Sequence, residues 1–345
     1  MRSELFGPSY VYEEGVLETS DCRFVLEWMM PHRPPDHCAL NYCLLERAAY
    51  RDSRWRLELT DRHHGREFSV SAKMLVNAGG VWADRIHQLC GLSSPYMHVF
   101  SKGVFIAIAR PEEHDDSLIF DMGEHGDGQT FHPWGPVSLW GPTETPVDSL
   151  DSGFRVEADD VRFLLAQANK NLQLSLDASD IVSLRCGVRP LAVKRGYSSG
   201  RHPLAYSRQH RVHHDRANAA IAVYGGKLTT CRELASEVVD KLKSQLRPSG
   251  IATPDDRPAF QRDDKSVPDP AWCRDNEFCL TLDDYLRRRS NIAQWVPRCG
   301  LGRDDGNLEE VRAAAQAIEG DEAEASFEGY RFRVREEYDT LLASI

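Results

Sequence analysis

Two segments of the chain share one layout, in which an apolar stretch ends in two adjacent glycines and then runs into a helical pattern. The first runs from Leu75 to Gly80 and the second from Val223 to Gly226. Because glycine has no side chain, a ligand can approach the backbone of such a turn closely. The amides at the start of the following helix then favour an anionic or electron-rich partner. The two turns predict a ligand site where two strands end, although an ordinary strand-to-helix turn explains the first equally well.

The bulk composition excludes several classes of protein. The chain has 345 residues, too many for one ordinary core, with 41% hydrophobic and 28% charged residues, as in soluble globular proteins. No apolar run approaches the ~18 residues of a membrane-spanning helix, which leaves only peripheral membrane contact open. A net charge of -11 argues against general nucleic-acid binding. The nine cysteines form no CxxC pair and the first residues do not resemble an export signal, so we expect a cytoplasmic protein with reduced thiols.

Hydrophobic periodicity predicts an antiparallel meander near the start of the chain, followed by a mixture of strands and helices. We expect a helix over 21–30, capped by Ser20 or Asp21, and meander strands over 39–45, 54–60 and 67–76, the last ending in a buried stretch at 74–76. Further strands are expected over 99–109, 137–140 and 219–224, and helices over 158–174, 229–246 and beyond Thr281. Residues 248–270 are rich in Pro and Asp, which is typical of a linker.

Three cationic side chains lie near these elements and suit an anion. Arg189 is followed by Pro190, which favours extended geometry and directs the planar guanidinium away from the strand. Lys227 belongs to the second diglycine turn, and Arg208 lies shortly before the strand that leads to it. Each alone would be typical of a surface ion pair in a chain with 53 acidic residues. Together, the three would bind a phosphate monoester well.

Two other groups of charged or metal-binding residues predict nothing specific. The pairs His63-His64 and His213-His214 have no acidic or thiol partner at ligand spacing, so we expect no metal site. The run from Arg287 to Arg289 is most simply a solvated helix face.

Six segments in order bring a known family into view: LVNAGGVWAD, SKG, WGPTET, CGVRPL, YSR and VYGGKLTT. Over residues 10–245 the chain resembles the FAD-dependent glycerol-3-phosphate dehydrogenases, within the superfamily that includes D-amino-acid oxidase. The resemblance implies a mixed α+β or α/β fold with an FAD-binding, Rossmann-like domain from residues 1–95 and 185–246. An antiparallel-sheet substrate domain would be inserted at 96–184. A linker at 247–270 and a C-terminal helical domain at 271–345 would follow.

The resemblance also implies a chemistry and a set of site residues. FAD would be the cofactor, and the activity would be oxidation of sn-glycerol 3-phosphate to dihydroxyacetone phosphate, with electrons passed to a quinone-type acceptor. A homodimer is left open. Arg189 and Lys227 match residues that hold substrate beside the flavin, and Arg208 matches a further basic residue there. The implied cofactor-binding residues are Gly79 and Gly80 near the dinucleotide, and Gly225, Gly226, Leu228 and Thr229 against the flavin.

The chain also departs from the family pattern. The GxGxxG turn that binds the FAD pyrophosphate is absent, which predicts an incomplete FAD domain that binds FAD weakly or not at all. Phe105 stands where the family has a histidine, and phenylalanine cannot transfer a proton. Glu144 replaces the family's aspartate and keeps the carboxylate. Two alternatives therefore stay open: another flavin oxidoreductase of the superfamily, acting on a hydroxy acid or amino acid, and a non-enzymatic remnant without cofactor.

Overall fold

The computed structural model describes residues 10–30, 37–122, 128–151, 154–172, 174–196, 205–248 and 267–345. The strands are β1 (Cys43–Arg51), β2 (Arg54–Asp61), β3 (Arg66–Ala72), β4 (Leu75–Asn77), β5 (Tyr96–Ala109), β6 (Leu118–Asp121), β7 (Gly128–Trp134), β8 (Val137–Gly141), β9 (Thr145–Val147), β10 (Ile181–Lys194), β11 (Arg211–Asp215) and β12 (Ala220–Tyr224). The helices are α1 (Asp21–Met29), α2 (Ala83–Leu89), α3 (Ala158–Asn171), α4 (Cys231–Leu246), α5 (Pro270–Asn276), α6 (Leu282–Asp284), α7 (Ile292–Trp295), α8 (Leu308–Glu319), α9 (Ala323–Val334) and α10 (Thr340–Ala343). Among these described residues, no helix is long and apolar enough to cross a membrane.

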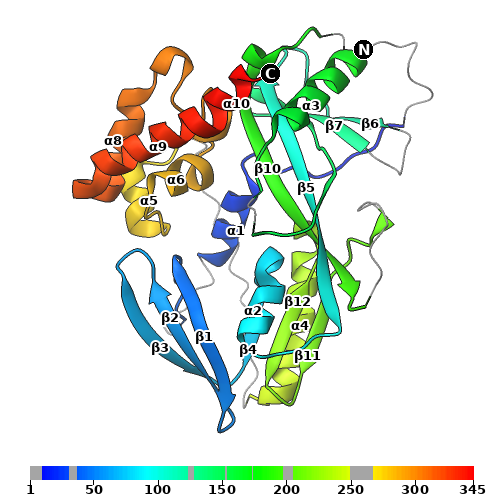
Figure 1. The fold of residues 1–345 in the computed structure, drawn as a ribbon, viewed down its shortest axis with the longest axis vertical. Coiled ribbons are helices and arrows are strands. Elements are labelled where there is room, and N and C mark those ends of the chain that lie inside the picture. The colour runs from blue at the N-terminus through cyan, green and yellow to red at the C-terminus, as the bar shows by residue number, and fades with distance from the viewer. Residues whose placement is uncertain are drawn as a thin grey trace.

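Two long antiparallel strands, β5 and β10, run side by side through the middle of the molecule (Figure 1). They belong to a six-stranded sheet with the order β10-β5-β8-β7-β6, and β9 pairs with β5 beside this path. β10 is one continuous strand from Ile181 to Lys194, so it crosses the expected boundary between residues 184 and 185. The mixed α/β architecture with an antiparallel sheet and C-terminal helices agrees with the expected fold class.

Helix α3 covers one face of the large sheet. Its buried residues recur at helical spacing: Val161, Leu164, Leu165 and Ala168. They pack against the sheet residues Val104, Ile106 and Trp140, and the indole of Trp140 also donates a hydrogen bond of 3.0 Å to the carbonyl of Leu164. The same hydrophobic cluster continues into the C-terminal helices. Because this shared core covers one face of the sheet, a site on the sheet must lie on the opposite face.

The meander is a separate three-stranded sheet, and its outline differs from the expectation at both ends. Its first strand begins at Cys43, because Tyr42 has a φ of +54° and cannot continue an extended strand. The expected strand 67–76 divides after Ala72: β3 stays in the meander, and β4 joins another sheet. Val76 is 38% exposed, so the prediction of a buried stretch at 74–76 is wrong. β4 lies at an edge of its sheet, which leaves one side without a neighbouring strand among the described residues.

The small sheet has the order β11-β12-β4, with β4 parallel to β12. Leu75 pairs with Ala220 and Asn77 pairs with Ala222. Because parallel strands in register end at the same edge of a sheet, the diglycine turns that follow β4 and β12 lie at one edge. The two turns are therefore neighbours in the structure. The indole of Trp55, which is fully buried, donates to the carbonyl of Ala219 and joins the meander to this sheet.

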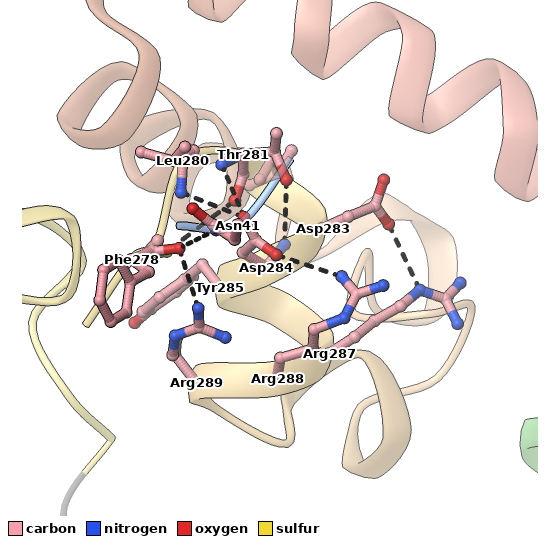
Figure 2. Close-up of polar contacts among 12 residues, drawn as sticks. Asn41, Phe278, Leu280, Thr281, Asp283, Asp284, Tyr285, Arg287, Arg288 and Arg289 are labelled. Carbon is pink, nitrogen blue, oxygen red and sulfur yellow. Dashed lines mark hydrogen bonds and ion pairs between the residues drawn. The ribbon is translucent and has the colours of Figure 1, made fainter. Parts of the chain in front are cut away.

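The C-terminal region contacts the residues just before β1 through the segment shown in Figure 2. The amide of Asn41 donates to the carbonyl of Phe278, and Arg289 donates to the same carbonyl and to that of Glu277. Arg288 lies 3.3 Å from Asp284. Arg289 therefore helps to hold this region together, and the prediction of a solvated helix face is wrong for this residue. Arg288 is exposed, as that prediction expects. Of the expected linker 247–270, residues 249–266 lie outside the described residues.

An ion pair joins α1 to the C-terminal helices, and we expect it to be important for stability. Arg23 and Glu277 lie 2.7 Å apart, with side chains only 7% and 3% exposed. Arg23→Ala would leave Glu277 buried without its partner, so the free energy of unfolding should fall by ~3–5 kcal/mol. Chemical denaturation of the purified chain measures this loss.

Two further variants serve as controls for this prediction. The double variant Arg23→Met, Glu277→Met should lose much less stability, because no unpaired charge stays buried. Arg47→Ala, in the exposed pair with Glu58, should cost under ~1 kcal/mol. Equal losses for Arg23→Ala and Arg47→Ala would contradict the assignment.

Candidate functional site

The turn after β12 places backbone amides where a ligand could accept hydrogen bonds. Gly225 and Gly226 have φ angles of +63° and +99°, a region that favours glycine, and they lead into a 3₁₀ turn, Leu228–Thr230, and then α4. Within the described part of the chain, the amides of residues 226–229 have no hydrogen-bond partner. Amides at a helix start carry partial positive charge. The turn therefore suits an electron-rich group.

His98 holds this turn in place from β5. Its side chain is fully buried, and its Nε2 accepts a hydrogen bond of 3.1 Å from the amide of Gly225. Its Nδ1 lies 2.8 Å from a carboxylate oxygen of Asp84, at the start of α2. Because Nε2 accepts, the proton of the neutral ring must be on Nδ1, which donates to Asp84. His98 thus connects the helix after the first diglycine turn with the backbone of the second.

The first diglycine turn, which follows β4, is held in place mainly by the side chain of Asn77. Asn77 is buried, accepts from the amide of Gly79 at 3.1 Å and donates to the carbonyl of Ala83 at 2.8 Å. A Cβ at Gly79 would overlap Ile86 of α2, so this glycine serves helix packing. A Cβ at Gly80 would meet no atom within 4 Å. Only Gly80 of this pair therefore faces open space.

Arg189 lies across the neighbouring strand, over Gly103. A Cβ built on Gly103 would lie 2.5–2.8 Å from the guanidinium of Arg189, so only glycine leaves room for it. The guanidinium is 3.0 Å from Glu144, whose other carboxylate oxygen accepts a hydrogen bond from Ser101. Burial lowers the pKa of Arg189, and the charge of Glu144 counteracts this. The SKG, GPTET and GVRPL segments therefore meet at one place.

The three expected cations are only partly brought together. Arg208 lies 4.0 Å from the same Glu144 oxygen that Arg189 contacts, and its charge lowers the pKa of Arg189 further. Lys227 is exposed at the diglycine turn, and no bond in the described structure joins it to either arginine. Leu228 and Thr229 lie in the 3₁₀ turn that follows. The negative charge that the two arginines share is therefore the carboxylate of Glu144, a residue of the same chain.

Sequence reasoning missed His98 and Asp84 as parts of the site, and it gave no reason for Gly103. His98 and Asp84 are 14 residues apart and meet only through the packing of α2 against the sheet. The signal for Gly103 was its place in SKG, but its role depends on the register of β5 and β10, where Gly103 pairs with Gly187. A sequence alone does not contain that register.

We expect His98→Phe to lower the free energy of unfolding by ~1–3 kcal/mol, because the amide of Gly225 and the carboxylate of Asp84 both lose a partner. Chemical denaturation measures the loss, and His63→Phe on an exposed loop serves as the control. Nitrogen NMR of the native histidine should show the proton on Nδ1. A proton found on Nε2 would contradict the assigned contact.

Comparison with known proteins places this geometry in a family. Residues 40–235, more than half of the chain, match the family described as DAO, FAD dependent oxidoreductase. The chain is 30% identical over 208 residues to the aerobic glycerol-3-phosphate dehydrogenase of Escherichia coli, covering 57% of this chain and 40% of that protein. It is 26% identical over 251 residues to the enzyme of the same name from Staphylococcus epidermidis, covering 71% and 43%. The chain thus spans less than half the length of these relatives.

A solved structure shares the fold. The glycerol-3-phosphate dehydrogenase from Bacillus halodurans complexed with FAD superposes with a TM-score of 0.57 at 20% identity, covering 94% of this chain and 62% of that one. The turn after β12 fits such a cofactor, because its unbonded amides and positive φ angles offer a backbone surface to an electron-rich ring. Together with the family match, this establishes that the chain belongs to the DAO family of FAD-dependent oxidoreductases.

Proposed function

We propose that the chain carries the substrate site and part of the cofactor site of an enzyme that oxidises sn-glycerol 3-phosphate to dihydroxyacetone phosphate. Similarity to proteins named glycerol-3-phosphate dehydrogenase supports the substrate. The acceptor in this proposal is a quinone, which would be met by peripheral contact with a membrane. The observation that carries the proposal is the pair Arg189 and Arg208 on Glu144, close to the turn after β12.

Two segments that carry the arginines also border the turn after β12. Ala192 of β10 abuts Gly225, since a Cβ on that glycine would lie 3.1 Å from the Cβ of Ala192. Arg189 precedes Ala192 by three residues on the same strand, and its guanidinium lies over Gly103 on the neighbouring strand. Arg208 is followed by Gln209, whose carbonyl also borders Gly225. The proposal places a phosphorylated three-carbon alcohol with its phosphate at the arginines and its alcohol toward the turn.

The charges of the site favour a phosphate group. Glu144 neutralises one of the two arginines, so one positive charge remains at this place, and the ammonium of Lys227 adds another at the turn. In the proposal, Arg189 and Arg208 bind the phosphate through charge-assisted hydrogen bonds. Lys227 polarises the alcohol oxygen and stabilises negative charge as its proton leaves. Phe105 shares the sheet face with Arg189 but takes no part in proton transfer.

Bound FAD would supply the hydride acceptor, which no side chain provides. The proposal assigns Gly225, Gly226, Leu228 and Thr229 to the flavin and Gly80, with Gly79, to the dinucleotide. It keeps residues 1–95 and 185–246 as the cofactor domain and 96–184 as the substrate domain, with β10 as the strand common to both. A homodimer is part of the same proposal.

The direct test is anaerobic mixing of the chain, supplied with FAD, with sn-glycerol 3-phosphate. Loss of the flavin absorbance band supports the proposal. Arg189→Ala should weaken reduction by the phosphorylated substrate by ~2 kcal/mol or more while leaving the slow reaction of glycerol nearly unchanged. Equal losses with both substrates would mean that Arg189 serves the cofactor or the fold.

Gly103→Ala tests the same site without removing a charge. The new methyl group would displace the guanidinium of Arg189, which is the flexible end of a side chain, so the fold should lose under ~1 kcal/mol. Binding of sn-glycerol 3-phosphate should nevertheless weaken about tenfold, because a charged contact worth ~1.4 kcal/mol or more is misplaced. Calorimetric titration measures the affinity, and unchanged binding would contradict the role of Arg189. Gly329→Ala, in α9, where the new methyl group would meet no atom within 4 Å, is a matched control outside the site.

A further inference from the structure

The side-chain amide of Asn77, which holds the first diglycine turn, has only one workable orientation. Its oxygen accepts a hydrogen bond of 3.1 Å from the amide of Gly79, and its nitrogen donates one of 2.8 Å to the carbonyl of Ala83. A backbone N–H can only donate, and a backbone carbonyl can only accept. The backbone on both sides therefore fixes which end of the Asn77 amide is nitrogen.

His87 of α2 contacts that same nitrogen. Nδ1 of His87 lies 3.4 Å from Nδ2 of Asn77, which carries hydrogens and can only donate. Nδ1 is therefore the acceptor, and the neutral ring carries its proton on Nε2. A proton on Nδ1 would place two donors against each other. Turning the amide of Asn77 would not relieve this, because its nitrogen would then face the amide of Gly79 and its oxygen the carbonyl of Ala83.

The surroundings of His87 also favour the neutral ring. His87 is only 4% exposed, and the ring of His213 on β11 lies nearby, with the two ring centroids 6.3 Å apart. Burial lowers the pKa of His87, and the charge of His213 lowers it further. Burial and the charge of His214 lower the pKa of His213 as well. A proton at this place would thus be buried beside a second histidine.

The other polar groups around His87 counteract these effects only in part. The backbone of Ser93, the carboxylate of Asp84 on α2 and that of Asp215 on β11 raise the pKa of His87, but by smaller amounts. Each carboxylate already accepts hydrogen bonds from other residues. The ring of Tyr224 on β12 lies 6.2 Å from that of His87, and burial raises its pKa, so it stays neutral. None of these groups provides a full counter-charge for a protonated His87.

We propose that His87 is a positioning residue for the cofactor site: as a neutral base it holds the first diglycine turn through Asn77, and a proton on its ring releases that turn. The inference rests on the proposed function for the assignment of Gly79 and Gly80 to the dinucleotide. Its pH dependence has a definite sign. The neutral ring contributes fully to stability above about pH 6.5, the ordinary pKa of histidine, and this contribution is lost as the pH falls through the lower pKa of the folded state.

Hydrogen exchange of the Gly79 amide, followed by NMR of the full chain without cofactor, tests the proposal. Protection factors are compared, because they remove the ordinary pH dependence of exchange. Between about pH 7.5 and about pH 5, the protection of Gly79 should fall about fivefold or more, the factor for loss of one ordinary hydrogen bond. Nitrogen NMR should show the proton of neutral His87 on Nε2.

Two histidine variants separate this role from general effects of acid. His87→Asn can place an amide oxygen near the position of Nδ1 and does not titrate, so Gly79 should keep its protection at about pH 5. His114→Asn is the matched control. His114 is also buried, has a pKa lowered by burial and uses its Nδ1 in a hydrogen bond, but it bonds Ser138 in the large sheet. Its replacement should leave the fall at Gly79 unchanged.

The outcomes decide the inference independently of the proposed function. Protection of Gly79 that does not depend on pH, an equal fall in the wild type and in His87→Asn, or a neutral His87 with its proton on Nδ1 overturns the inference. The two wild-type measurements stand without the variants, should one of these not fold. Failure of sn-glycerol 3-phosphate to reduce the flavin rejects the proposed function and leaves the role of His87 in the turn standing, because exchange is measured without cofactor.

Discussion

The antiparallel pairing of β5 with β10 is the interaction on which the rest of the structure depends. It runs from Tyr96 opposite Lys194 to Ile108 opposite Ile181, and so reaches from the small sheet to the large core. One face of the pair carries the apolar residues that bury α3. The other carries Gly103, Phe105, Arg185 and Arg189. A slip of one residue would exchange these faces, moving the cations into the core.

The site is also organised by buried polar contacts that are paired within the chain. Glu144 accepts hydrogen bonds from Ser101 and Arg189, and His98 joins Asp84 to Gly225. Groups buried in this way cost free energy unless they are paired, so each contact selects one arrangement of its neighbours.

The glycines of the site act in different ways although they look alike in the sequence. Gly225 and Gly226 permit a backbone conformation that other residues adopt rarely. Gly103 makes room for a guanidinium, and Gly79 makes room for Ile86. We expected a ligand to approach the backbone of each diglycine turn. At Gly79, the side chain of Ile86 occupies that space instead. This is why residue type alone could not separate ligand contacts from internal packing.

The sequence by itself determined the local features of this protein: helix α1 with its Ser20 cap, the stripe of α3, the apolar strand β12 and the two diglycine turns. It also identified the family, because the characteristic segments occur in the family's order along the chain. Periodicity and turn residues of this kind depend only on neighbouring positions in the sequence. Tertiary structure alone decided which segments meet. β4 leaves the meander for another sheet, Glu144 reaches both arginines, and Arg185 is left facing Trp134. These outcomes depend on strand register and on packing between residues far apart in the chain, which no local pattern contains.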